Sequence, residues 1–273
     1  MTSKIEQKLI RQCGFKTRKA FEGYLEKSLK SLEGPAENLK QTFEKALQQW
    51  IFDYLKGEQG RFVARIEAPP QTPGANDLNP LLKNPSRCAE KILNSWKDFL
   101  AWEKIPGTKC SKNPPLRHDP PKFLKTIPDI VRFRIICNYL KDLRYIDERL
   151  RSYAEEEPHL KIKNREDHIF SQFPCSRAGH RAIEYTLGFR GKEVRFLFEV
   201  QIMTQLQHAW DKKDHHLIYE HIRAGKGDQI PVHLKNRVAA MSELLYVADT
   251  IFDELLRDIS TIKSHTKTED GKN

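Results

Sequence analysis

Two acidic side chains in expected strands are the first candidates for chemistry. Glu199 lies within the apolar segment 198–203, and Asp129 stands where another apolar segment begins. Successive side chains of a strand alternate between its faces, so Glu199, Gln201 and Met203 share one face. Burying a carboxylate is costly unless a cation, a metal or hydrogen-bond donors meet it. Glu199 is therefore a candidate site residue, and a structural ion pair or an exposed sheet face is the alternative.

Carboxylates from two strands can hold Mg²⁺ between a triphosphate and a nucleophile, while basic side chains neutralise the phosphates. Asp129 and Glu199 could supply such a pair, and Asp211 and Asp214 follow on the next expected helix. The alternative for Asp129 is a turn or cap residue, which is a common role for an aspartate before a strand.

Composition restricts the class of protein. The 273 residues are 38% hydrophobic and 31% charged, which is typical of a soluble globular protein. We expect no membrane association, since neither a membrane span nor a secretion signal fits the sequence. Five scattered cysteines without metal-binding spacing predict reduced thiols in a cytoplasmic protein. The net charge of +10 favours polyanionic partners such as nucleotides, RNA or acidic surfaces.

The first half of the chain is predicted to be helical and interrupted by loops. Apolar residues at three- and four-residue spacing predict two or three helices in a 1–60 extension, with a break at Gly34-Pro35. Segments 68–85 and 106–121 are expected loops whose order the sequence does not decide, and residues 88–102 between them form an expected helix.

From Pro128 onward, strands and helices alternate. Strands are expected at 130–139, 160–164, 180–189 and 193–202, the last two forming a hairpin, and helices at 141–157 and 204–223. The predicted class is α+β, with a mixed β-sheet of about five strands flanked by helices. A C-terminal helix, within residues 226–262, should pack on domain 61–225, and residues 263–273 should form a disordered tail.

Four motifs in this order resemble the RelA/SpoT synthetase domain family over roughly residues 61–220. Residues 129–136 (DIVRFRII) are similar to its D-[IL]-x-G-x-R-[IV]-I strand, and residues 179–183 (GHRAI) to its G-Y-[RQ]-S-I segment. Residues 199–204 (EVQIMT) are similar to its E-[IVL]-Q-[IV]-R-T strand. The segment from His208 to Tyr219 is similar to its H-A-W-x-x-x-x-H-x-x-x-Y helix, with His215 at the second histidine.

The resemblance implies a nucleotidyltransferase-like fold that transfers pyrophosphate from ATP to the ribose 3′-hydroxyl of a guanine nucleotide, as in (p)ppGpp alarmone synthesis. It implies that Asp129 and Glu199 bind Mg²⁺, that Glu199 assists deprotonation of the hydroxyl, and that Gln201 supports this strand face. The implied nucleotide-binding residues are Arg65, Lys91, Arg134, Lys163, Arg165, Arg177, His180, Arg181 and His208.

The sequence also departs from the family motifs. His180 stands where the family has the tyrosine that stacks on the acceptor base, and Met203 where it has an arginine. The other departures are Glu67 for a lysine, Arg132 for a glycine, Glu166-Asp167-His168-Ile169 for K-D-Y-I, and Ala182 and Glu184 for the serine and histidine of S-I-H. Most of the changes remove positive charge, so guanine preference and the rate of catalysis stay open.

Three functions remain open at this stage. The first is a small pyrophosphokinase that uses ATP and GDP or GTP, without hydrolase activity because residues 1–60 contain no histidine. The second is a toxin that pyrophosphorylates the tRNA 3′ end, which the basic charge would suit. The third is a degenerate domain that senses nucleotides or binds RNA. Homo-oligomerisation and an antitoxin partner are left open.

Overall fold

The computed structural model describes residues 4–57, 62–69, 79–102, 124–171, 179–191, 194–214, 217–218, 221 and 229–269. The helices are α1 (Lys4–Gln12), α2 (Arg18–Gly57), α3 (Pro85–Trp102), α5 (Leu140–Glu156), α6 (Gln205–Asp214) and α7 (Val232–Glu269), with a 3₁₀ turn η1 (Pro128–Ile130). The strands are β1 (Ala64–Glu67), β2 (Val131–Cys137), β3 (Leu160–Asp167), β4 (Ile183–Arg190) and β5 (Arg195–Thr204).

The strands form one five-stranded sheet in the order β1-β2-β5-β4-β3. β2 and β5 are parallel, and the other neighbours are antiparallel, so the predicted mixed sheet and α+β class are confirmed. The expected hairpin is β4 and β5. The fifth strand is β1, a four-residue segment at the sheet edge that is too short to show an alternating pattern of its own.

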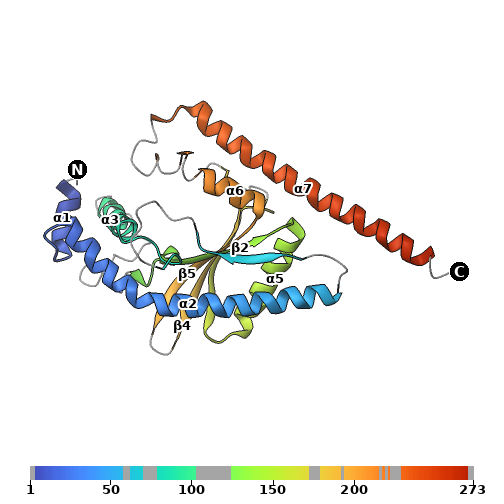
Figure 1. The fold of residues 1–273 in the computed structure, drawn as a ribbon. Helices are drawn as coiled ribbons and strands as arrows, with labels where there is room; N and C mark the ends of the chain where they lie inside the picture. Colours follow the sequence, from blue (N-terminus) through green and yellow to red (C-terminus); the bar gives the residue numbers. More distant parts are fainter. Residues whose placement is uncertain are drawn as a thin grey trace.

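One face of the sheet forms the hydrophobic core. Phe133 of β2 and Phe198 of β5 are fully buried there, and the ring of Phe43 from α2 packs 5.0 Å and 5.9 Å from them. Helix α5 packs on the same face. Helix α6 covers part of the opposite face, with the long α7 beyond it (Figure 1). Because β5 alternates as predicted, its core side chains are buried while Glu199 and Gln201 lie on the other face.

The expected helix break at Gly34-Pro35 is wrong, because α2 runs through Pro35 from Arg18 to Gly57. Proline inside a helix costs about 3 kcal/mol. Here Leu32, Ala36 and Leu39 stay in register on one buried face, and their burial offsets that cost. The chain turns instead at Gly14, whose φ of 86° is in the region that favours glycine, between α1 and α2.

Other boundaries also differ from the expected ones. β3 continues to Asp167, since Asp167 pairs with Ile183 of β4. α7 continues to Glu269, past the expected end at Ile262 and into the expected tail, because neither glycine nor proline interrupts it. α6 ends at Asp214, and most of the expected helix beyond it lies outside the described residues. Residues 103–123, with the second expected loop, and 70–78 of the first are likewise outside them.

Helix α7 exposes a row of large apolar side chains. Leu244, Val247, Ile251 and Leu255 are 49–63% exposed. Their spacing places them along one side of the helix. Despite its length, neither α7 nor any other helix in the described ranges is apolar enough to cross a membrane.

Candidate active site

The sheet face beneath α6 carries polar side chains in two rows that run across the strands. Directly paired residues form one row, Glu67, Arg134, Gln201, Glu184 and Glu166. A second row consists of Arg132, Glu199, Thr186 and Asn164. Paired residues on neighbouring strands lie side by side on one face, so these charged and polar side chains share the face opposite the core.

Arg134 lies at the centre of the first row and is buried. Its guanidinium donates to Gln201 Oε1 at 2.9 Å and to Asp211 Oδ2 at 2.6 Å, and its Nη1 contacts His208 Nδ1 at 3.3 Å. Arginine can only donate, so His208 Nδ1 must accept and His208 Nε2 donates to Glu67 at 2.9 Å. Burial and the Arg134 charge lower the pKa of His208, which keeps this ring neutral.

Glu67, where the family has a lysine, completes this group from β1. It accepts from Arg65 Nε at 2.6 Å as well as from His208. Burial raises the pKa of Glu67, but Arg65 and His208 lower it further, to about 2. Arg65 is 45% exposed, so its charge reaches solvent although it is paired. Glu67 thus positions two of the expected binding residues, Arg65 and His208.

His180 is held between two carboxylates. Its Nδ1 is 3.0 Å from Asp211, and its Nε2 is 3.0 Å from Glu184. Burial lowers the pKa of His180, but Asp211 and Glu184 raise it more, to about 9. The imidazole is therefore charged at neutral pH, with a hydrogen bond at Nδ1 and an ion pair at Nε2 that hold the ring in place.

The backbone conformation at residue 179, just before His180, requires a glycine. Its φ is 104°, and a Cβ added there would lie 2.8 Å from Cβ of Ser242 in α7. The Ser242 hydroxyl also donates to the Gly179 carbonyl. A side chain would meet both backbone strain and a clash, so this glycine fixes the close approach of α7 to the site.

Glu199 lies on the same sheet face, next to Arg132 of β2. No hydrogen bond or ion pair joins it to any other described residue, whereas Arg132 stands directly beside it on β2. The Arg132 Nε is buried without a hydrogen-bond acceptor among the described residues. Burial, with the nearby charges of Glu184 and Asp129, raises the pKa of Glu199 to about 7. Such a group can gain and lose a proton at neutral pH.

Asp129 is bound by two lysines. Lys83 and Lys91 donate to its two carboxylate oxygens, Lys91 at 2.5 Å. Burial raises the pKa of Asp129, but the two lysines hold it well below its usual range. Burial also lowers the pKa of Lys83 to about 8 although Asp129 opposes this. Sequence analysis missed Lys83, whose only local signal is a lysine directly after the apolar pair Leu81-Leu82.

Arg165 and Arg181, two expected phosphate-binding residues, do not face this site. Arg165 lies on the core face, where it binds Asp147 of α5 through two hydrogen bonds of 2.9 Å. The cause is an irregularity between Ile162 and Asn164 in the pairing of β3, since one extra residue moves every later side chain to the other face. Lys163 lies at the irregularity. It is exposed, and its aliphatic side chain contacts Gly188 of β4.

Arg181 is the second residue that the structure removes from the expected set. It is 2% exposed, donates to Glu243 of α7 at 2.5 Å and packs over the ring of Tyr246. Glu243 of α7 therefore pairs with the Arg181 guanidinium, which was expected to bind phosphates. Arg177, His215 and Tyr219 lie outside the described residues.

Comparison with known proteins was consistent with the four motifs. A family profile described as "Region found in RelA / SpoT proteins" matches residues 103–223. No curated protein sequence gave a significant match.

Solved structures show the same fold at low sequence identity. Small alarmone synthetase 1 from Bacillus subtilis is 17% identical, with a TM-score of 0.53 over 85% of this chain and 97% of that one. A second structure of that protein, bound to its product pppGpp, is 16% identical, with a TM-score of 0.54 over 86% and 99%. A GTP pyrophosphokinase family protein from Streptococcus pneumoniae is 15% identical, with a TM-score of 0.52 over 85% and 95%. The chain therefore carries a RelA/SpoT-type region on the fold of the small alarmone synthetases.

Proposed function

We propose that this protein is a pyrophosphokinase that transfers pyrophosphate from ATP to the ribose 3′-hydroxyl of a guanine nucleotide. The observation that carries the proposal is Glu199, a carboxylate of β5 with a pKa of about 7 and no hydrogen bond or ion pair to another described residue. Asp129 lies nearby in η1 with Lys83 and Lys91 bound to it. The match of residues 103–223 to RelA/SpoT proteins supports the reaction class.

In the proposed reaction, Glu199 takes the proton of the acceptor hydroxyl. The hydroxyl oxygen forms a bond to the β-phosphorus of ATP, the bond from that phosphorus to the α–β bridging oxygen breaks, and AMP leaves with the electron pair. A base whose pKa lies near the working pH is suited to this step. Arg132, whose buried Nε has no acceptor among the described residues, is positioned beside Glu199 to bind a phosphate oxygen.

Mg²⁺ is the cofactor that the resemblance implies, and the donor set fits it. Asp129 and Glu199 offer the carboxylate oxygens that Mg²⁺ prefers, and the acidic groups around Glu199 favour a cation. Lys91 is 41% exposed and could exchange Asp129 for a phosphate when nucleotide and metal bind. Bound Mg²⁺ would neutralise charge on the transferred pyrophosphate. We expect Asp129 and Glu199 to hold it.

The remaining nucleotide contacts would come from cations at the edges of the sheet face. Arg65, Lys91 and Lys163 reach solvent and can contact phosphates. Arg134 and His208, also expected to bind nucleotide, are buried in the network, so we assign them to positioning Gln201, Asp211 and Glu67. His180 would contact the acceptor through its charge instead of stacking.

A second candidate is a nucleotide sensor or RNA-binding module without catalysis. The observation that favours it is that ion pairs within the protein occupy several expected site groups: Asp129 with two lysines, His180 with two carboxylates and Arg181 with Glu243. A third candidate is transfer of pyrophosphate to tRNA, which the net charge of +10 favours. The experiment below distinguishes the three candidates.

The test is an acceptor screen with ATP labelled in the β-phosphate and Mg²⁺. GDP, GTP and tRNA are offered in turn to the wild type and to the Glu199→Gln and Glu148→Gln variants. Transfer to GDP or GTP by the wild type and Glu148→Gln supports the proposal, since Glu148 is an exposed carboxylate on α5, remote from the site. Transfer only to tRNA would change the acceptor. Nucleotide binding without transfer to any acceptor would refute catalysis and support the binding module.

We extend the proposal to self-association through α7. Identical apolar rows on two copies can bury each other across a two-fold axis, and the row centred on Leu244 and Ile251 is long enough for several helical turns. The molar mass by light scattering should rise with concentration, and Leu244→Lys should lower it. A monomer at all concentrations would contradict this extension.

A further inference from the structure

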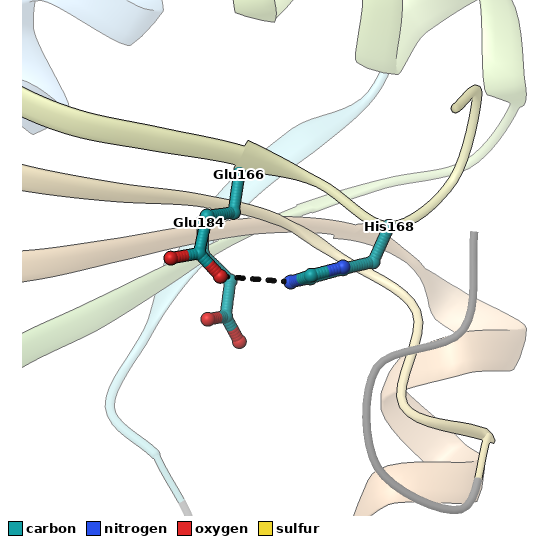
Figure 2. Close-up of side chains that lie close together, drawn as sticks. All are labelled: Glu166, His168 and Glu184. Carbon is teal, nitrogen blue, oxygen red and sulfur yellow. Dashed lines mark ion pairs between the residues drawn. The ribbon is translucent and has the colours of Figure 1, made fainter. Parts of the chain in front are cut away.

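Beyond the expected Mg²⁺ pair, a second group of metal-ligating side chains lies at the far side of the same sheet face. Glu166 and Glu184 project from β3 and β4, and the His168 ring points toward them from the end of β3 (Figure 2). One ligand atom from each residue lies within 4.8 Å of the other two. The His168 Nε2 is 3.3 Å from Glu166 Oε2.

The carboxylates of the two glutamates repel each other unless positive charge lies nearby. Glu166 and Glu184 are paired directly across antiparallel strands. Like charges in that position destabilise a sheet. The described contacts to Glu184 Oε1 come from the Gln201 amide and from His180, and Asn164 donates to Glu166 at 2.8 Å. His180 also pairs with Asp211, so the positive charge beside Glu184 is shared with a third carboxylate.

The distances are close to those of a metal centre. Ligand atoms about 2.1 Å from one ion lie within about 4.2 Å of one another, so a small side-chain adjustment would suffice. The Glu166 side chain is 53% exposed and the Glu184 side chain 27%, so both carboxylates are reachable from solvent. One imidazole with two carboxylates is a mixed nitrogen and oxygen set, and this set suits first-row transition metals better than Mg²⁺.

We propose that Glu166, His168 and Glu184 form a binding site for a divalent transition-metal ion of the zinc type. Three protein ligands leave a position open for water or for an oxygen of a bound nucleotide, as in sites where zinc is not purely structural. The three residues are all departures from the family motifs, so this site is a property of this chain's own sequence.

The irregularity in β3 assembles the group. It shifts the pairing between Ile162 and Asn164, so Glu166 faces Glu184 and Arg165 turns to the core. Without that shift, Arg165 would stand among the acids in place of Glu166 and would satisfy them as an ion pair. The same local feature that removes an expected phosphate ligand thus brings two carboxylates and an imidazole together on one sheet face.

The proposal is tested by calorimetric titration of the full-length protein with Zn²⁺, and separately with Mn²⁺, in excess Mg²⁺ and without nucleotide. We expect one Zn²⁺ per chain. His168→Ala and Glu184→Gln should each weaken binding at least about tenfold. Glu166→Gln should act in the same direction, and its exposed side chain makes misfolding a poor explanation of any loss. Thermal melting of each metal-free variant shows whether it folds.

Two control variants locate the site. His159→Gln removes an exposed histidine in the turn before β3, and Glu199→Gln removes a carboxylate of the expected Mg²⁺ pair. Both should bind Zn²⁺ as the wild type does. Wild-type protein without a Zn²⁺ site, or binding that folded His168→Ala and Glu184→Gln retain in full, would overturn the proposal. The readout needs no acceptor or transfer, so failure here and failure of the proposed enzyme activity are separate outcomes.

Discussion

Glu199→Gln should abolish pyrophosphate transfer while making the protein more stable at pH 8. Burial and the charges of Glu184 and Asp129 raise the pKa of Glu199 from 4.5 to about 7. Loss of a general base typically lowers a rate by about two to four orders of magnitude. Without bound Mg²⁺ only about a tenth of Glu199 is ionised one pH unit below its pKa, and a bound cation lowers that pKa, so the acidic limb of the transfer profile should lie below pH 7.

The stability effect follows from the same pKa. Between pH 4.5 and 7 the folded protein binds more protons at Glu199 than the unfolded chain does, so the free energy of unfolding decreases as pH rises and is constant above pH 7. Each pKa unit corresponds to 1.36 kcal/mol, so the ionised carboxylate costs up to about 3 kcal/mol. Glutamine avoids that cost. The variant should melt several degrees above the wild type at pH 8 and at the same temperature near pH 4.

The assays are label transfer from pH 5.5 to 9 and urea denaturation at pH 4 and 8. Glu148→Gln, on exposed α5 surface, should match the wild type in both. Glu184→Gln should move the acidic limb of the transfer profile to lower pH, because Glu184 contributes to the raised pKa of Glu199. The reasoning is refuted if Glu199→Gln transfers within tenfold of the wild type, or if it is no more stable at pH 8.

Three further predictions concern the surrounding network. Arg134→Met should lower the free energy of unfolding by about 3–5 kcal/mol, because it removes the buried guanidinium that binds Asp211 and Gln201 and leaves His180 as the cation paired with Asp211; a loss under 1 kcal/mol in urea titration would contradict this. His180 has a folded pKa of about 9 against 6.5. The ion pairs of His180 should stabilise the folded protein by up to about 3 kcal/mol below pH 6.5, and this stabilisation should be lost as pH rises through 9. If the free energies of unfolding of the wild type and His180→Gln differ by the same amount from pH 6 to 10, the prediction is wrong. Asp147→Asn should lower stability but leave transfer per folded molecule unchanged, because Asp147 lies on the core face; reduced transfer by folded protein would count against that placement.

Local regularities made much of the fold predictable. The alternation in β5 is a property of any extended strand, so the sequence placed Glu199 and Gln201 opposite the core without knowledge of neighbouring strands. The hairpin of β4 and β5 and the mixed sheet were likewise predictable from strand length and turn residues. The continuity of α2 through Pro35 was not predictable from the sequence. The sequence shows only the local penalty of a proline in a helix, whereas the burial of the α2 face, which offsets it, depends on the tertiary structure.

The sequence by itself determined the four motifs and the face of β5 on which the candidate Glu199 lies, since both depend on residue type and short spacing. Only the tertiary structure decided what each charge contacts. Lys83 meets Asp129 across 46 positions, and Arg181 meets Glu243 across 62. The irregularity in β3 then decided that Arg165 belongs to the core and Glu166 to the site. Pairing across strands and helices brings distant residues together, and one extra residue in a strand reverses the face of all that follow.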